Sequence, residues 1–199
     1  MKSNAVSGFK FGPSIMDMTI LVVFIISVIF NLVQFPISLA QNTSDIYNLY
    51  NKGAFQDGLG NHAGAINYYD QALGINPKYI NALAGKGVAL DSLGNHTGAI
   101  NYYDQALGIN PNNINVLTNK GVALDSLGNH TGAIKYYDQA LGIDPYDTNV
   151  LTDKGIALNN LGNYTGSINY YDQALGINPN NINALTNKGI ALNNLGNHN

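Results

Sequence analysis

The distribution of apolar residues along the chain changes near residue 40. Before that point, Ile20 to Phe30 form an apolar run, ILVVFIISVIF, without a charged side chain. After it, apolar residues recur three and four positions apart, with Asn, Asp, Gln and Lys between them. A continuous apolar run is typical of a targeting or membrane segment, whereas a spacing of three and four residues is that of an amphipathic α-helix. The sequence therefore predicts an N-terminal hydrophobic helix followed by an all-α domain.

The helical part of the sequence repeats with a period of 34 residues. The period is marked by prolines at Pro77, Pro111, Pro145 and Pro179. Such a period is typical of repeat architectures, in which each unit is one supersecondary structure. The predicted domain, residues 46–199, has four complete units and a half unit: 46–79, 80–113, 114–147, 148–181 and 182–199.

Each unit contains two helical segments joined by a short turn. In the second unit, the first segment has its apolar stripe at Leu83, Gly87, Leu90 and Leu93. The second segment has its stripe at Ala99, Ile100, Tyr103, Ala106 and Leu107. We expect Thr97 to be the N-cap of the second helix. Asn110 and Pro111 end that helix, because proline lacks the N–H that the next turn requires.

Small residues allow the two helices of a unit to approach closely, at Gly87, Ala99 and Ala106 in the second unit. One helix pair cannot bury its apolar stripe alone, so we expect neighbouring units to stack into a solenoid. Of the adjacent tyrosines, Tyr103 falls on the buried stripe. Tyr102 lies about 100° away around the helix and is expected to be partly exposed.

A unit with these residues resembles the tetratricopeptide repeat. The residues that carry the resemblance are Leu83, Gly87, Leu90, Ala99, Tyr103, Ala106 and Pro111, and the pattern recurs in register from Ile46 to Asn199. The resemblance implies a right-handed α-solenoid of stacked antiparallel helix pairs. It also implies a non-catalytic scaffold that binds a peptide or protein segment in a concave groove lined by the first helix of each unit.

The resemblance assigns a set of side chains to that groove. The groove-facing candidates are Tyr47, Tyr50, Asn51, Asn81, Asn115, Thr118, Asn119, Asn149, Thr152, Asp153, Asn183 and Asn187. The floor is expected at Val88, Val122, Ile156 and Ile190. This wall is polar, nearly uncharged and rich in amides, which both donate and accept hydrogen bonds. Family members that grip a C-terminal carboxylate use Lys, Arg and Asn. Here Val88 and Val122 stand where a key Asn would be and arginine is absent, so that clamp is not expected.

Composition argues against several kinds of site. The 199 residues include nine Lys, twelve Asp, no Arg, no Glu and no Cys, and the net charge is −3. Nucleic-acid binding calls for a basic face, and thiolate metal sites call for cysteine. The sequence contains no Ser/His/Asp order, phosphate-binding glycine loop or HExxH motif. We therefore predict no enzymatic activity, no cofactor, no metal and no nucleic-acid partner.

Histidine and lysine also recur with the unit. The histidines are His62, His96, His130 and His198, with Tyr164 in the fourth place. Equivalent side chains on stacked helices lie roughly 8–10 Å apart or more, too far to share a metal ion, so a packing role in the turn is favoured. The lysines are Lys52, Lys86, Lys120, Lys154 and Lys188. They either face an anionic partner as a row or pair with an aspartate of the preceding unit. We favour the pairing, with Asp70, Asp104, Asp138 or Asp172.

Residues 1–40 have the features of an export segment. Lys2 and Lys10 precede the apolar run, and Ser38 and Ala40 are the small residues of a cleavage site after Ala40. The alternative is an uncleaved membrane anchor within residues 15–39, which has the length of a transmembrane helix. In both interpretations residues 41–45 are a short linker and the repeats are extracytoplasmic, either secreted or anchored. Four N-x-[ST] sequons are candidate glycosylation sites: Asn42, Asn95, Asn129 and Asn163.

The sequence leaves the partner of the scaffold open. An amide-rich groove also suits sugar hydroxyls, so a glycan- or cell-envelope-binding module is an alternative function. An accessory subunit of an enzyme on another chain is a further alternative. The half unit keeps apolar Leu192 and Leu195 where a terminal unit usually becomes polar. Either the half unit is an adequate cap, or this end self-associates, or more repeats followed in an ancestral or complete form.

Overall fold

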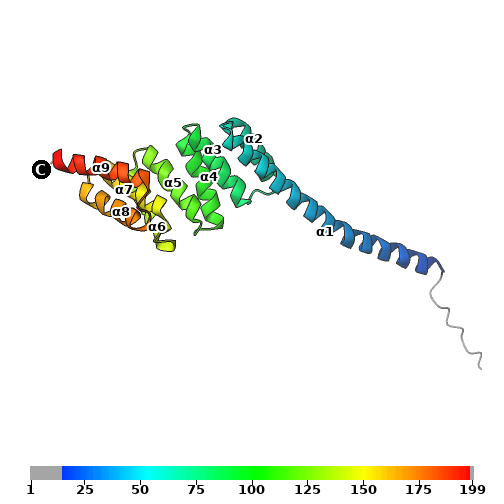
Figure 1. Cartoon of the computed structure of the whole chain (residues 1–199). Helices are drawn as coiled ribbons and strands as arrows, with labels where there is room; N and C mark the ends of the chain where they lie inside the picture. Colours follow the sequence, from blue (N-terminus) through cyan, green and yellow to red (C-terminus); the bar gives the residue numbers. More distant parts are fainter. Residues whose placement is uncertain (1–14, 198–199) are drawn as a thin grey trace, which may run out of the picture. The chain divides into compact units, whose positions relative to one another are not determined.

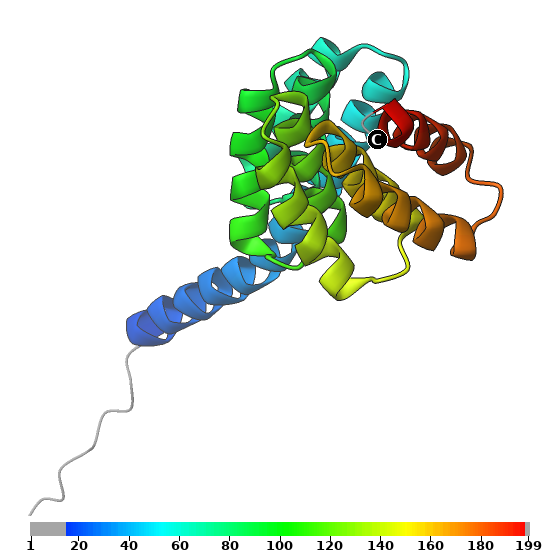
Figure 2. The same cartoon turned by 90° about the vertical axis from the view of Figure 1, so that its left-hand side faces the viewer.

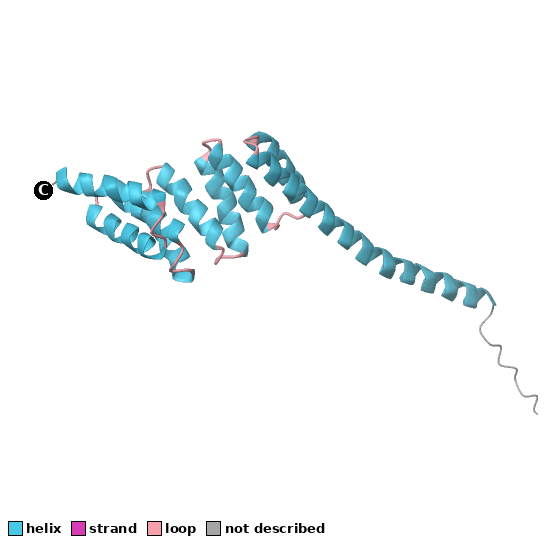
Figure 3. Ribbon diagram, in the orientation of Figure 1, coloured by secondary structure: helices cyan, strands magenta, loops and turns pink. Residues whose placement is uncertain are grey.

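The computed structural model describes the backbone of residues 15–197 and the side chains of residues 22–29 and 42–196. The chain divides into two compact units, Met1–Asp45 and Ile46–Asn199. The described residues form nine helices (Figure 1), and no strand occurs among them (Figure 3). The all-α fold predicted from the spacing of apolar residues is therefore confirmed.

Helix α1, Ile15–Gly58, begins in the first unit and ends in the second. The apolar side chains between Val22 and Ile29 are exposed, and residues 41–45, predicted as a linker, are helical. Within the part of the chain that the structure describes, no helix is long and apolar enough to cross a membrane. The signal peptide or anchor at residues 1–40 falls largely outside the residues whose side chains are described, and it stays a prediction.

The second unit contains the end of α1 and eight further helices. They are α2 His62–Ile75, α3 Ile80–Ser92, α4 His96–Ile109, α5 Ile114–Ser126, α6 His130–Ile143, α7 Thr148–Asn160, α8 Tyr164–Ile177 and α9 Ile182–Asn197. Within this unit the helices form antiparallel pairs that stack in sequence order (Figures 1 and 2). The predicted solenoid of stacked pairs is confirmed, with α9 as the first helix of the half unit.

The two helices of a pair meet where a tyrosine ring lies against a glycine. Tyr103 of α4 is 1% exposed, and a Cβ atom on Gly87 of α3 would overlap its ring. The same contact recurs between Tyr69 and Gly53, Tyr137 and Gly121, and Tyr171 and Gly155. Tyr102 is half-buried, as the helical period predicts. Close approach of the two backbones therefore requires glycine at these places.

An asparagine caps the second helix of each pair. In the second unit, Asn95 Oδ1 accepts a hydrogen bond from Gly98 N at 2.9 Å. Gly94 has a φ of 78°, in the left-handed region that glycine adopts without strain. The prediction that Thr97 caps this helix is wrong, because α4 already begins at His96 and Thr97 lies in its first turn. The turn at Gly94 brings Asn95, a stronger capping residue than threonine, to the capping position.

The second helix ends before the proline, as predicted. Helix α4 stops at Ile109, and Asn110 is extended, with a φ of −130°. The Asn110 side chain accepts a hydrogen bond from Asn112 N at 3.1 Å, which starts the turn toward the next unit. In the third unit the Asp144 side chain accepts the equivalent bond from Tyr146 N at 3.0 Å. The junction between units is thus an Asx turn that asparagine and aspartate form equally well.

Candidate interaction surface

Two cavities are lined mainly by first helices of successive units, and we call the surface along these helices the groove. A cavity of about 310 Å³, the first cavity, opens between α1, α3 and α5. Its wall includes Tyr50 and Asp57 from α1, Asn81 and Val88 from α3, and Asn115 from α5. A phenol, a carboxylate, two amides and an aliphatic side chain from three units therefore converge on one space.

A second cavity, of about 140 Å³, lies farther along the groove. Helix α5 contributes Val122, Asp125 and Ser126, helix α7 contributes Asp153 and Ile156, and α6 contributes Tyr137. Asp125 and Asp153 belong to successive first helices, so this cavity joins the third unit to the fourth.

The residues assigned to the groove from the sequence fall into three groups. Those that line the two cavities are Tyr50, Asn81, Asn115 and Asp153, with Val88, Val122 and Ile156. Those exposed outside these cavities are Tyr47, Asn51, Asn149, Asn183 and Ile190. Those half-buried outside them are Thr118, Asn119 and Asn187.

Thr152, one of the groove candidates, is buried. Thr152 is only 3% exposed, and its hydroxyl donates a hydrogen bond to the backbone carbonyl of Thr148 at 2.6 Å. A threonine hydroxyl inside a helix commonly bonds the carbonyl one turn earlier. Thr152 is therefore packed within the repeat and does not offer its hydroxyl to a ligand.

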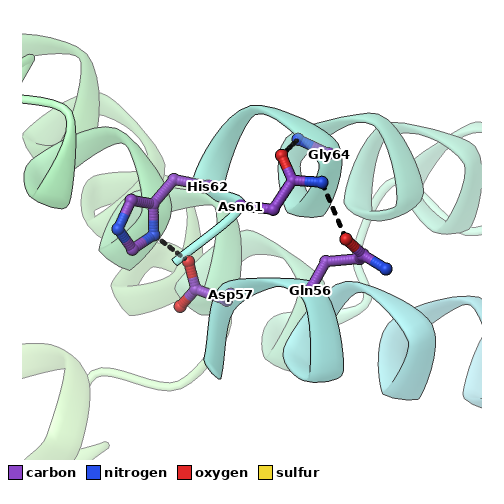
Figure 4. A network of polar contacts seen from close by, with 5 residues as sticks. All are labelled: Gln56, Asp57, Asn61, His62 and Gly64. Atoms are coloured by element: carbon purple, nitrogen blue, oxygen red, sulfur yellow. Dashed lines mark hydrogen bonds and ion pairs between the residues drawn. The ribbon is translucent and has the colours of Figure 1, made fainter. Parts of the chain in front are cut away.

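In units one to three, an aspartate near the end of the first helix contacts the histidine that begins the second helix. Asp57 Oδ1 lies 2.6 Å from His62 Nδ1 (Figure 4). Asp91 and His96 are 2.6 Å apart, and Asp125 and His130 are 2.5 Å apart. A carboxylate accepts hydrogen bonds only, so Nδ1 carries the hydrogen in each pair. The histidines are held in the turn, which agrees with a packing role, but their carboxylate partners were missed.

The fourth unit contains the sequence signal for these pairs. It has Asn159 and Tyr164 where the first three units have Asp and His, so both partners change in this unit, whereas the half unit has Asn193 with His198. The asparagines at this end of the helices bond across units. Asn160 Nδ2 donates to Asp125 Oδ2 at 3.4 Å, and Asn194 Nδ2 donates to Asn159 Oδ1 at 3.2 Å. The last turns of successive first helices are therefore tied together by hydrogen bonds.

Four of the five lysines that precede a repeat glycine pair with an aspartate of the preceding unit. The pairs are Lys86 with Asp70, Lys120 with Asp104, Lys154 with Asp138, and Lys188 with Asp172. Lys120 also donates to the Tyr136 hydroxyl at 2.6 Å, and its Nζ lies 4.2 Å from the centre of that ring. Burial lowers the pKa of Lys120, but hydrogen bonds to Asp104 and Tyr136 outweigh it and leave the pKa raised. The favoured interpretation, pairing between units, is confirmed for these four lysines.

The charges that line the two cavities are negative. Asp57 lines the first cavity, and Asp125 and Asp153 line the second. No lysine is among the residues that line either cavity. The expectation of a nearly uncharged groove is therefore wrong at these two places. Asp57 and Asp125 lie near the ends of the first helices, where the repeat resemblance assigned no groove contact, whereas Asp153 was assigned to the groove.

The sequence profile of the tetratricopeptide repeat (TPR) matches residues 80–113 and 114–147, and a second profile of the same description matches residues 46–79 and 148–181. These matches run without a gap from residue 46 to residue 181. The chain belongs to the tetratricopeptide repeat family. The resemblance inferred from the repeated Leu, Gly, Ala, Tyr and Pro positions is confirmed.

Solved TPR structures share the fold at low sequence identity. A crystal structure of MamA is 20% identical in sequence and has a TM-score of 0.66. The match covers 72% of the present chain and 84% of the MamA chain. YrrB, described as a TPR protein with an unusual peptide-binding site, is 20% identical, with a TM-score of 0.63 and coverage of 79% and 81%. The pilF protein of Pseudomonas aeruginosa is 20% identical, with a TM-score of 0.72 and coverage of 76% and 69%. A search of curated proteins finds no match.

Three of the candidate glycosylation sites are the N-cap residues of second helices. Asn95, Asn129 and Asn163 each accept a hydrogen bond from the backbone N–H of a glycine three residues later, at 2.9–3.0 Å. Asn42 is exposed on α1. A sugar on one of the three caps would have to be accommodated beside this hydrogen bond. Glycosylation stays a prediction at all four positions.

The TPR fold is in general an interaction scaffold. Among the described residues, no group of three or more His, Cys, Asp or Glu side chains is arranged to hold a metal ion. The groove with its two cavities is the surface on which such a scaffold offers both polar and apolar contacts.

Proposed function

We propose that the TPR domain is a non-catalytic interaction scaffold that binds an extended protein segment along its groove. The observation that carries the proposal is the first cavity, about 310 Å³ in volume and shared by the first helices of three units. A segment seated in a cavity that spans three units would contact several repeats at once.

The wall of the first cavity has the chemistry that a peptide requires. The amides of Asn81 and Asn115 donate and accept hydrogen bonds, as backbone peptide groups do. Val88 supplies an apolar contact, and Tyr50 adds an aromatic side chain with a polar end. The peptide-binding site named for the similar protein YrrB supports a peptide as the kind of ligand here.

A substitution that fills the first cavity tests the proposal. Ala84 lines this cavity, and Tyr50 occupies the equivalent place in the first unit, so the repeat accommodates a tyrosine there. The full chain would be screened on a peptide array, and the best peptide titrated by fluorescence anisotropy. We expect Ala84→Tyr to weaken binding by about tenfold or more. Gln105→Tyr, at an exposed position of the second helix α4, is the control and should leave binding unchanged.

Exposed amides favour one alternative partner. Asn51, Asn149 and Asn183 are exposed on the first helices, and such groups also bond sugar hydroxyls. A glycan- or cell-envelope-binding module is therefore the second candidate, and an accessory subunit of an enzyme on another chain is a third. Affinity capture from envelope extract, followed by mass spectrometry and glycan analysis, separates a protein ligand, a glycan and a co-purifying enzyme.

Export of the repeats is part of the proposal. The apolar run and the small residues Ser38 and Ala40 support either cleavage of residues 1–40 or retention of an anchor within residues 15–39. N-terminal sequencing of the mature chain distinguishes the two. A mature protein that starts at Gln41 would establish cleavage, and an intact N-terminus in a membrane fraction would establish the anchor.

The exposed face of α9 is proposed as a surface for self-association. Leu185 is 51% exposed, whereas Leu151, at the same place in the preceding unit, is 2% exposed. Burial of such apolar surface against a second copy is favourable. Light scattering over a range of concentrations tests this, and a mass that stays monomeric throughout would exclude it.

A further inference from the structure

One short segment, at the junction of the third and fourth units, differs from its counterparts. Residues 144–155 read DPYDTNVLTDKG, whereas residues 110–121 and 178–189 read NPNNINVLTNKG and NPNNINALTNKG. Three of the differences replace Asn by Asp, at Asp144, Asp147 and Asp153. Because the units are nearly identical, a segment that differs can give one repeat a binding property that the others lack. The three changes each add a negative charge.

The second cavity brings one of these aspartates together with a carboxylate of the preceding unit. Asp153 of α7 and Asp125 of α5 both line it, with Ser126 beside them. Val122 and Ile156 add aliphatic surface. A volume of about 140 Å³ corresponds to four or five water molecules at ~30 Å³ each, which is room for one side chain. The cavity therefore combines a pair of acids with an apolar wall in a space of side-chain size.

The lysine nearest to this cavity in sequence is engaged outside it. Lys154, the neighbour of Asp153 in sequence, pairs with Asp138 and donates to the Tyr170 hydroxyl at 2.6 Å. Within the cavity wall, Asp125 Oδ1 contacts His130 Nδ1 at 2.5 Å, and Asp125 Oδ2 accepts a hydrogen bond from Asn160 Nδ2 at 3.4 Å. The lysine of the fourth unit thus does not neutralise the pair of acids.

The environment of Asp153 favours a cation. Its pKa is raised to about 6, first by burial and then by the negative charges of Asp147 and Asp125. A carboxylate that is partly desolvated among other carboxylates is stabilised when a positive charge comes within a few ångström. A ligand that brings such a charge would therefore gain binding energy that a neutral ligand does not.

We propose that the second cavity binds the side chain of a lysine or arginine from the segment held in the groove. The aliphatic part of that side chain lies against Val122 and Ile156, and its cationic head reaches the carboxylates of Asp125 and Asp153. This inference rests on the proposed function, because the bound segment delivers the side chain. A Ca²⁺ ion fits less well, since it takes about six to eight oxygen ligands and the side chains of the cavity offer two carboxylates, the Ser126 hydroxyl and the Tyr137 phenol.

Two matched series of extended peptides test the inference with the full chain. Each peptide of the first series carries one lysine at a scanned position of a neutral background. Its partner carries norleucine at that position, which keeps the aliphatic chain and removes the ammonium group. Affinities are measured by fluorescence anisotropy at pH 7.5. We expect one lysine register to bind about tenfold or more tightly than its norleucine partner.

The variant Asp153→Asn should remove most of that advantage. Asn119 and Asn187 occupy the same place in the neighbouring units, so the repeat accommodates asparagine there. Asp144→Asn is the matched control. It removes the same charge at an exposed Asx-turn position, which is asparagine at Asn110 and Asn178, and it should leave the lysine advantage unchanged.

The outcomes separate this inference from the proposed function. Equal binding of both series, or an equal effect of the two variants, overturns the inference and leaves peptide binding in the groove intact. If no peptide of either series binds, peptide binding in the groove is wrong and the inference fails with it. A Ca²⁺ titration of the peptide-free chain that saturates in the wild type but not in Asp153→Asn assigns the cavity to a metal ion and also overturns the inference.

Discussion

The Nδ1 atom of His96 lies 2.6 Å from Oδ1 of Asp91 and joins the first turn of α4 to the last turn of α3. The first and third units contain the same pair, whereas the fourth unit replaces both residues, by Asn159 and Tyr164. A hydrogen bond to a charged group contributes more to stability than one between neutral groups. Removal of one partner leaves the other without its hydrogen bond, which costs stability. The two residues therefore act together in holding the turn.

We expect the substitutions Asp91→Asn and His96→Tyr to be coupled. Each one alone disrupts the pair and should lower the free energy of unfolding by about 1 kcal/mol. Together they reproduce the combination of the fourth unit, so the double variant should lose less than the sum, with a coupling of about 0.5–1 kcal/mol. Urea unfolding of the four proteins in the cycle measures this. Strictly additive losses would show that the two side chains stabilise the turn independently.

A methyl group at Gly87 should be strongly destabilising. A Cβ atom there would overlap the ring of Tyr103, which is buried and cannot move without disturbing the pair of helices. We expect Gly87→Ala to cost about 1–3 kcal/mol of unfolding free energy, the range of overpacked cores. Gly189 is the equivalent residue of α9, where a Cβ would meet nothing within 4 Å. Gly189→Ala should be neutral or stabilising by up to about 1 kcal/mol, because alanine is the better helix former. Thermal unfolding compares the two, and similar losses for both would exclude the packing explanation.

The core contact of Tyr103 with the glycine of its own pair could be predicted from the sequence. Packing within a helix pair follows the helical period, which is visible in one unit and repeated in the next. The pairing of Lys120 with Asp104 could be predicted for a related reason, because opposite charges recur at fixed places in successive units. Features that depend only on the period of the repeat are therefore accessible without a structure.

The groove could be predicted only in part. Thr118 and Thr152 occupy the same place in successive units and both donate to a carbonyl of their own helix, yet Thr118 is half-buried and Thr152 is buried, a difference that no period encodes. The convergence of Asp125 and Asp153 on one cavity depends on how two successive units are stacked. The choice of Asn95 over Thr97 as the cap depends on the left-handed backbone at Gly94. Each of these follows from tertiary geometry and not from residue spacing.

Removal of Lys120 should destabilise the junction between the second and third units. Lys120→Met keeps the length of the side chain but loses the contacts to Asp104 and Tyr136. The Asp104 side chain is 54% exposed, so solvent weakens the ion pair, and we expect a modest loss of about 1 kcal/mol. Lys78→Met, at an exposed lysine, is the control and should stay within about 0.5 kcal/mol of the wild type.

The loss in Lys120→Met should persist across neutral pH. Because the folded pKa of Lys120 is raised above its ordinary value of 10.5, the stabilisation is complete below that value and declines only as pH rises through the folded pKa. Urea unfolding at pH 6 and pH 8 should therefore give the same difference from the wild type. A difference that disappears between these values would show that another titrating group controls the junction.

Asp153 should lower the stability of the folded chain at neutral pH. Its pKa is raised from 3.8 to about 6 by burial and by Asp147 and Asp125, so the folded state holds the proton more tightly than the unfolded state. Above pH 6 the carboxylate is ionised in both states, and its burial counts fully against folding. As pH falls from 6 toward 3.8, the folded chain takes up the proton first and the penalty declines.

Asp153→Asn should therefore raise the free energy of unfolding by about 1–2 kcal/mol at pH 7.5, after allowance for solvent screening. The gain should shrink as pH falls through the window between 6 and 3.8 and be absent below 3.8, where the carboxyl group is protonated in both states. Urea unfolding at several pH values within this range measures the gain relative to the wild type. Asp144→Asn, which removes the same charge at an exposed turn, should show no comparable pH dependence. A gain in Asp153→Asn that is constant over the whole range would mean that the amide stabilises α7 by packing or hydrogen bonding. The charge of Asp153 would then not be what limits stability at the second cavity.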